Sequence, residues 1–229
     1  MIGTLINVVA ILAGTAVGLL LRKGIPERLR ETVMQGLALC VVLIGVTGAI
    51  KANDTMCVIV SMVAGGLIGS AVNIELRLNQ LGALAERKLL KGQEGGSFAK
   101  GFVTSSLVYC VGAMAIVGAM DSGLRGNHAT LIAKAALDGI SAIFFASTMG
   151  AGVGLSALAV LVYQGSIALL ATWIAPLLTD PIINEMSAVG SLLIIGIGLN
   201  MIYDKHIAVG NMLPAIFVPM IYVPLSTLF

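Results

Sequence analysis

The chain has 229 residues, of which 58% are hydrophobic and only 10% charged, and its formal net charge is +2. A water-soluble domain of this length would need a far more polar surface to cover its core, and a nucleic-acid-binding domain would show a patch of excess positive charge. The composition therefore excludes both classes and indicates an integral membrane protein.

Eight apolar runs are long enough to cross a hydrocarbon core of roughly 30 Å as helices of about 20 residues. They cover residues 3–21, 33–50, 56–74, 98–120, 130–148, 153–173, 186–203 and 207–228. The sequence therefore predicts an all-α polytopic membrane helix bundle, with residues 1–229 forming a single integral membrane domain. Only residues 149–152 separate the fifth run from the sixth, so these two runs are either full spans or a re-entrant pair.

Lysines and arginines gather in the loops after the first and third runs and indicate an orientation. The first loop carries Arg22, Lys23, Arg28 and Arg30, and the segment 75–100 carries Arg77, Arg87, Lys88, Lys91 and Lys100. Basic residues accumulate on the cytoplasmic side of a membrane, so eight spans predict that both termini lie outside. The segment 75–100 is expected to be a basic amphipathic loop along the lipid headgroups, with a partner-binding loop as the alternative.

The spacing of the runs predicts two three-helix repeats, 1–74 and 151–229, on either side of a central helix pair in 101–150. The runs of the two sets begin at a nearly constant offset: Gly3, Val33 and Met56 correspond to Val153, Met186 and Ile207. The second set begins five spans after the first, an odd number, so the repeats should have inverted topology, as in many secondary transporters. The alternative is a chance alignment of apolar helices.

The fifth run contains two charged residues, Lys134 and Asp138, whose spacing puts both on one helix face. Charge inside a span is costly and marks functional sites, although a neutralising structural pair is the alternative. A break follows at Thr148, Gly150 and Gly152, where helix ends can present backbone groups to an ion or solute. These five residues form the centre of a predicted binding site.

Three polar residues in other runs are candidates to complete this site: Tyr109, Gln164 and Asn200. Each has an alternative as a partner in an interhelical hydrogen bond worth about 1 kcal/mol or less, and Asn7 in the first run has the same ambiguity. The sequence has no HExxH, P-loop, GxSxG or CxxC motif, and its two histidines are widely separated. We therefore expect no catalytic or metal site, no cofactor and no enzymatic activity.

Small residues and prolines predict details of the packing. Gly14 with Gly18 and Gly65 with Gly69 form small-xxx-small faces that allow close helix approach, which we expect within the chain rather than in a dimer. The last run contains Pro214, Pro219 and Pro224. Each proline removes a helix hydrogen bond, so this run should be kinked or partly unwound.

The stretches GGLIG (65–69), LVYCVGAMAIVG (107–118), KAALDG (134–139), FASTMGAGV (145–153) and NMLPA (211–215) carry a family resemblance. The chain resembles, over almost its whole length, the YqgA/YdfK-like family of uncharacterised bacterial inner membrane proteins. The resemblance implies a multi-helix fold in the bacterial plasma membrane. Members of this family are often labelled as transport proteins, but the resemblance supplies no substrate and no proven functional residues.

We therefore expect a secondary transporter or ion-coupled permease for a small solute or ion. Its partners would be the lipid bilayer and that solute or ion, and the protein would act alone or as a homo-oligomer, without nucleic acid. One alternative is a non-transporting membrane scaffold or sensor, in which the polar pair only determines helix register. A channel is the other alternative.

Overall fold

The computed structural model describes residues 1–22, 26–80, 84, 97–203 and 207–226. The regular structure in these ranges is helical, in this order: α1 (Ile2–Arg22), α2 (Glu27–Ala49), α3 (Thr55–Val72), α5 (Ser97–Cys110), α6 (Ala113–Leu124), α7 (Ala129–Met149), α8 (Gly152–Leu169), α9 (Ala171–Ile174), α10 (Asp180–Ile202), η1 (Val209–Phe217) and α11 (Pro219–Ser226). The predicted all-α fold is confirmed. Most of the predicted loop 75–100 lies outside the described residues.

Seven helical segments in the described part of the chain are long and apolar enough to span a membrane. An eighth span exists if α5 and α6, which are bent by 62° relative to each other, together cross the bilayer. The exposed faces of the spans are apolar, and α3, for example, exposes more than half of Ile59, Val63 and Leu67. Such faces suit lipid and not water, in agreement with a polytopic membrane protein.

The fourth predicted run is not one straight helix. Within it, α5 ends at Cys110 and α6 begins at Ala113. Gly112 lies between them with φ +121°, a backbone conformation that glycine adopts without a steric penalty. The fifth and sixth runs form α7 with 21 residues and α8 with 18 residues, so each is long enough to be a full span.

Prolines shape the last run as expected. Its first half is the 3-10 helix η1, which contains Pro214, and α11 follows from Pro219. Because proline lacks the N–H that an α-helix needs, this segment is partly unwound. η1 lies against α3 at Gly65 and Gly69, where an added Cβ would clash with the backbone of η1. The expected role of these two glycines in packing within the chain is confirmed.

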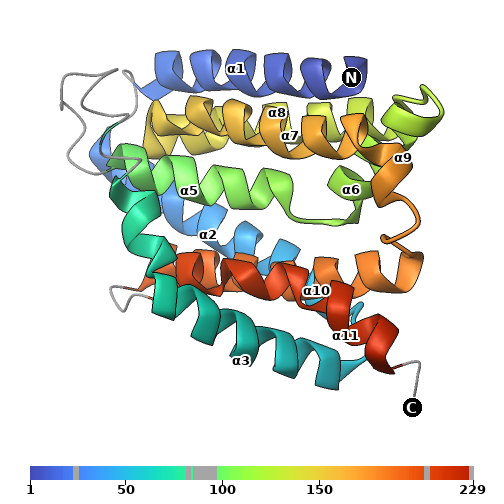
Figure 1. Ribbon diagram of the computed structural model, residues 1–229. Helices are drawn as coiled ribbons and strands as arrows, with labels where there is room; N and C mark the ends of the chain where they lie inside the picture. The colour runs from blue at the N-terminus through green and yellow to red at the C-terminus, as the bar shows by residue number, and fades with distance from the viewer. Residues whose placement is uncertain (23–25, 81–83, 85–96, 204–206, 227–229) are drawn as a thin grey trace. The chain divides into compact units, whose positions relative to one another are not determined.

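The contacts between residues divide the chain into two compact units. The first comprises Met1–Leu37, Leu78–Cys110 and Met114–Thr172, and the second comprises Ala38–Arg77, Val111–Ala113 and Trp173–Phe229. In the first unit, α1 lies along α7 and α8, and α5 packs on both α8 and α7 (Figure 1). α1 and α7 run parallel, because the α1 glycines Gly3, Gly14 and Gly18 meet α7 residues in the same order, namely Leu131, Gly139 and Ile143.

In the second unit, α2 and α10 pack antiparallel with a reciprocal pattern of contacts. A Cβ added at Gly45 would meet Ile195 and Ser191, and a Cβ added at Gly198 would meet Val42 and Ala38. When the starts of the two runs, Val33 and Met186, are aligned, Gly45 aligns with Gly198, Val42 with Ile195 and Ala38 with Ser191. This register is two residues away from the one that pairs Gly45 with Gly196 by sequence similarity. The contacts are therefore related by an approximate two-fold axis between these two helices. The inverted repeat as a whole stays a prediction.

Candidate functional site

The centre of the candidate site is an ion pair on one face of α7. The Lys134 Nζ lies 2.8 Å from Asp138 Oδ2 and donates to Asp138 Oδ1 at 2.9 Å. Only 7% of Lys134 and 5% of Asp138 is exposed. Because the residues are four apart on a helix, their side chains reach each other without any backbone distortion. A single ammonium group thus occupies both oxygens of a buried carboxylate.

Two neutral amides from other helices extend this pair. The Asn7 Nδ2 of α1 donates to Asp138 Oδ2 at 2.9 Å, and it lies 3.4 Å from the Gln164 Oε1 of α8. Asn7 and Gln164 are fully buried. We call Asn7, Lys134, Asp138 and Gln164 the polar cluster. It joins three helices of the first unit and carries one positive and one negative charge.

Glycines bring the polar cluster together. α1 and α7 approach closely because Gly14 faces the Gly139 carbonyl group, and Gly139 faces Ala10 in return. Small residues at such crossings let helix backbones come near each other in a membrane. Asn7 lies about two turns before Gly14 on the same buried face of α1, so the close approach also brings its short side chain within reach of Asp138.

Several polar atoms around the cluster have no hydrogen-bond partner in the described part of the chain. Within the cluster these are Asn7 Oδ1 and Gln164 Nε2, and Tyr109 of α5 adds its hydroxyl. The first unit contains six of the seven buried side-chain atoms of this kind, the others being on Thr4, Thr15 and Ser106. Burying a polar group without a partner costs roughly 1–3 kcal/mol by protein mutational data. Such groups ordinarily mark a place where water or a ligand binds.

Tyr109 packs against α7 outside the polar cluster. Its ring centroid is 6.2 Å from that of Phe145 on α7. Tyr109 is fully buried. The structure therefore brings three of the predicted site residues together: Lys134 contacts Asp138, and Asn7 links Asp138 to Gln164. Tyr109 packs on α7 at Phe145, about two helical turns beyond Asp138.

The break after α7 lies apart from this group. Thr148 is ten residues beyond Asp138 on the same helix, a distance of about 15 Å at 1.5 Å per residue, and its hydroxyl donates to the Phe144 and Phe145 carbonyls. Gly150 closes α7 through its N–H to Ala146. Gly152 lies where an added Cβ would clash with the Phe98 carbonyl group. These three residues act locally in helix termination and packing.

Asn200 belongs to the second unit. Its Nδ2 donates to the Ile207 carbonyl at 2.7 Å, and its Oδ1 accepts from the Ile207 N–H at 2.8 Å. Both ends of the amide are therefore used to connect the end of α10 with the start of η1. Asn200 therefore has a structural role: it forms hydrogen bonds to the start of the next predicted run, as in the alternative given for it in the sequence analysis.

Asn7 is the residue that the predicted site omitted. The buried face of α1 consists of Gly3, Thr4, Asn7, Ile11, Gly14, Thr15 and Gly18. These positions recur every three or four residues, and all except Ile11 are small or polar. A small and polar stripe on an otherwise apolar helix is a signal for an inward-facing site, and it would have included Asn7.

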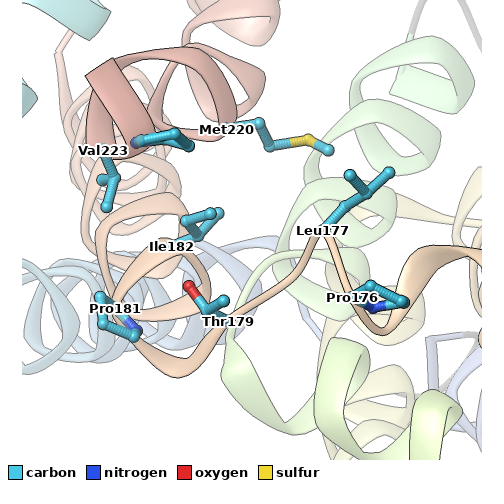
Figure 2. A pocket seen from close by; sticks show the side chains of 8 residues that line it. Pro176, Leu177, Thr179, Pro181, Ile182, Met220 and Val223 are labelled. Carbon is cyan, nitrogen blue, oxygen red and sulfur yellow. The ribbon is translucent and has the colours of Figure 1, made fainter. Parts of the chain in front are cut away.

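The second unit contains a cavity of about 420 Å³ between the loop before α10, the start of α10 and α11 (Figure 2). Met220 of α11 and Leu177 of the loop both line it, together with Pro176, Thr179, Pro181, Ile182, Val223 and Pro224. Its lining is almost entirely apolar and includes none of the predicted site residues. Among the described residues, no group of three histidine, cysteine or carboxylate side chains is placed to hold a metal ion.

Comparison with known proteins places the chain in a family. Residues 2–224 match the model of the family described as "Protein of unknown function (DUF554)". The chain is 33% identical to "Uncharacterized membrane protein YdfK" of Bacillus subtilis (strain 168), over 96% of this chain and 94% of that protein. It is also 33% identical to "Uncharacterized protein YqgA" of Escherichia coli (strain K12), over 98% and 96%. No solved structure matches. The chain therefore belongs to the DUF554 family of membrane proteins.

Proposed function

We propose that the protein is a secondary transporter or ion-coupled permease for a small polar solute or ion, and that the polar cluster is its binding site. The observation that carries this proposal is a charged pair on a membrane-spanning helix, joined to two buried amides whose Asn7 Oδ1 and Gln164 Nε2 have no hydrogen-bond partner among the described residues. Ionisable residues inside a membrane are expensive and typically mark ion or substrate pathways. A helix-packing device alone would be expected to satisfy its own polar groups.

The antiparallel contact between α2 and α10 supports the same proposal. Its two halves are equivalent when Gly45 is aligned with Gly198, as an inverted repeat requires. Transporters with inverted repeats place their sites near the bilayer midplane, between helices contributed by both repeats. α1 and α8 are the first helices of the two predicted repeats, and they contribute Asn7 and Gln164 to the polar cluster. We further propose a bacterial plasma membrane location with both termini outside.

A second candidate function is a non-transporting scaffold or sensor. The specific observation in its favour is that Lys134 engages both Asp138 oxygens, at 2.8 and 2.9 Å, so the two charges already neutralise each other. A pair of this kind can serve only to determine how α7 packs. The unpartnered atoms of Asn7 and Gln164 favour transport over this alternative.

The test is a ligand screen followed by uptake. Purified protein in detergent is heated with separate panels of amino acids, nucleobases, sugars and monovalent salts, each at constant ionic strength. A compound that raises the melting temperature of the wild type but not of Asp138→Asn is then assayed for uptake into proteoliposomes. Ligand-dependent stabilisation and uptake support the proposal if both are lost in Asp138→Asn while this variant still elutes as a folded, monodisperse protein on size-exclusion chromatography. Uptake that survives Asp138→Asn, or no response to any panel, supports the scaffold instead.

A further inference from the structure

We propose that water and small polar solutes reach the polar cluster along the contact between α1 and α8, and that Ile11 is the hydrophobic gate of this path. This inference rests on the proposed function and identifies the route that its solute takes through the protein. The whole path lies within the first unit.

Polar atoms without partners follow the two helices. Four side chains bury such an atom, which has no hydrogen-bond partner among the described residues: Thr4 Oγ1, Asn7 Oδ1, Thr15 Oγ1 and Gln164 Nε2. We call these four residues the polar row. Thr4, Asn7 and Gln164 are fully buried, and only 6% of Thr15 is exposed. Buried polar atoms that lack a protein partner ordinarily bind water or a ligand, so the row is suited to a hydrated path.

Helix geometry places the α1 members of the polar row along one side of that helix. At about 100° per residue, Ile11 and Thr15 lie within about 20° of Thr4 around the helix axis, and Asn7 lies within about 60°. Thr4 and Thr15 are about 16 Å apart along the axis at 1.5 Å per residue, which is about half of a 30 Å hydrocarbon core. The row therefore extends well into the membrane and is not confined to its surface.

α8 borders this side of α1 along the row (Figure 1). Gln164 Oε1 lies 3.4 Å from Asn7 Nδ2. Ten residues earlier on α8, a Cβ added at Gly154 would lie 3.2 Å from Thr15 Cγ2 and 3.8 Å from Thr15 Oγ1. The two helices are therefore antiparallel here, and the missing side chain of Gly154 leaves space beside the Thr15 hydroxyl.

The hydroxyl of Thr15 distinguishes this path from ordinary helix packing. Serine and threonine hydroxyls inside a helix can donate to a carbonyl group three or four residues earlier. Several residues of this protein make that bond, including Ser141, Thr148, Ser156 and Ser187. Thr15 has the carbonyl groups of Ile11 and Leu12 at the same spacing, yet its Oγ1 donates to neither. Its hydroxyl is therefore left for water or a solute at the contact with α8.

Ile11 interrupts the polar row near the middle of the membrane. It is fully buried, and it lies one residue from the midpoint of α1. Asn7 and Thr15 are each about one turn away from it along the helix, and Val160, between the two contacts on α8, is also fully buried. A hydrophobic constriction closes an aqueous path by dewetting. Thr4 thus leads to the polar cluster from the N-terminal end of α1, and Ile11 separates the cluster from Thr15.

The experiment maps water along α1 with single cysteines in membrane vesicles, in a variant without the three native cysteines. Thr4→Cys and Thr15→Cys place a thiol on the polar row, whereas Leu5→Cys and Ala16→Cys place one on the exposed side of the helix at nearly the same depth. A charged, impermeant methanethiosulfonate reagent reacts with thiolates, which form in water and not in an apolar environment, so each row thiol should react at least about tenfold faster than its neighbour. The deeper pair decides: if the thiol of Thr15→Cys reacts no faster than that of Ala16→Cys, the path is wrong.

The side from which the reagent acts tests the gate. In right-side-out and inside-out vesicles, the thiol of Thr4→Cys should react from the side of the N-terminus and that of Thr15→Cys from the opposite side. Adding Ile11→Ala should let both thiols react from both sides, whereas Leu12→Ala, which shortens an exposed side chain, should leave the sidedness unchanged. Reaction of Thr15→Cys from the N-terminal side while Ile11 is intact would overturn the gate, and so would unchanged sidedness in folded Ile11→Ala. The first of these outcomes can be measured even if Ile11→Ala does not fold.

The two proposals can fail separately, because the thiol reactions require neither a substrate nor transport. If solute uptake depends on Asp138 while the thiol of Thr15→Cys reacts no faster than that of Ala16→Cys, transport stands and this path is wrong. If the row thiols react as expected but no compound is taken up, the hydrated path stands and the proposed transport function is wrong.

Discussion

Gly14 is the position at which the packing of α1 against α7 can be tested most sharply. A Cβ added there would lie inside the contact distance of the Gly139 carbonyl oxygen and 3.1 Å from the Ala142 Cβ. These neighbours are backbone or Cβ atoms that cannot rotate away, so Gly14→Ala must push the helices about 1 Å apart, at a cost of roughly 1–3 kcal/mol. Alanine recovers about 1 kcal/mol through its higher helix propensity. The net loss should therefore be about 0–2 kcal/mol.

Two other glycines give a graded control series. Gly66 has nothing within 4 Å of an added Cβ, so Gly66→Ala should be neutral or stabilising by up to about 1 kcal/mol. Gly139→Ala would place its Cβ 3.2 Å from the Ala10 Cβ and should fall between the two. Thermal unfolding in one detergent, followed by size-exclusion chromatography, ranks the three variants. If Gly14→Ala and Gly66→Ala unfold at the same temperature, the proposed close contact between α1 and α7 is wrong.

The separation of α1 from α7 has a second consequence. Asn7 reaches Asp138 across this same interface at 2.9 Å, and a hydrogen bond lengthened by about 1 Å is effectively lost. Gly14→Ala should therefore weaken the ligand response as well as the fold, whereas Gly66→Ala should leave the response intact. A normal response in Gly14→Ala would show that the site does not depend on this contact.

Three further predictions concern single groups. Asp138→Asn leaves the buried Lys134 without its carboxylate and should lower the free energy of unfolding by about 3–5 kcal/mol. The double variant Lys134→Met/Asp138→Leu should restore most of this stability but show no ligand response. A double variant as unstable as Asp138→Asn would contradict this prediction. Glu185 Oε1 accepts from the N–H groups of Asn53 and Asp54 at 2.7 and 3.1 Å. Glu185→Ala should therefore cost about 2–4 kcal/mol and speed hydrogen exchange of both amides, whereas Glu185→Gln should protect them. Equal exchange in the two variants would count against these two hydrogen bonds. Finally, single cysteines placed at either terminus after removal of the native cysteines should react with an impermeant reagent from outside, and reaction only from the cytoplasmic side would reverse the topology.

Local chemistry made several features readable from the sequence alone. A hydrocarbon core excludes charge and unpaired backbone groups, so the apolar runs predicted an all-α membrane protein and most of its spans. Helix periodicity placed Lys134 and Asp138 on one face, because a spacing of four residues has the same geometry in any α-helix. Pro214 predicted the irregular last span because its missing N–H acts within its own turn.

Only the tertiary structure decided which faces meet. Asn7 and Asp138 are far apart in the sequence and come together because α1 and α7 cross at Gly14 and Gly139. Asn200 resembled Gln164 in the sequence as one polar residue in an apolar span, yet both ends of its amide form hydrogen bonds with the backbone of Ile207. Whether a polar side chain joins a site or satisfies a nearby backbone group depends on long-range packing, which local periodicity does not contain.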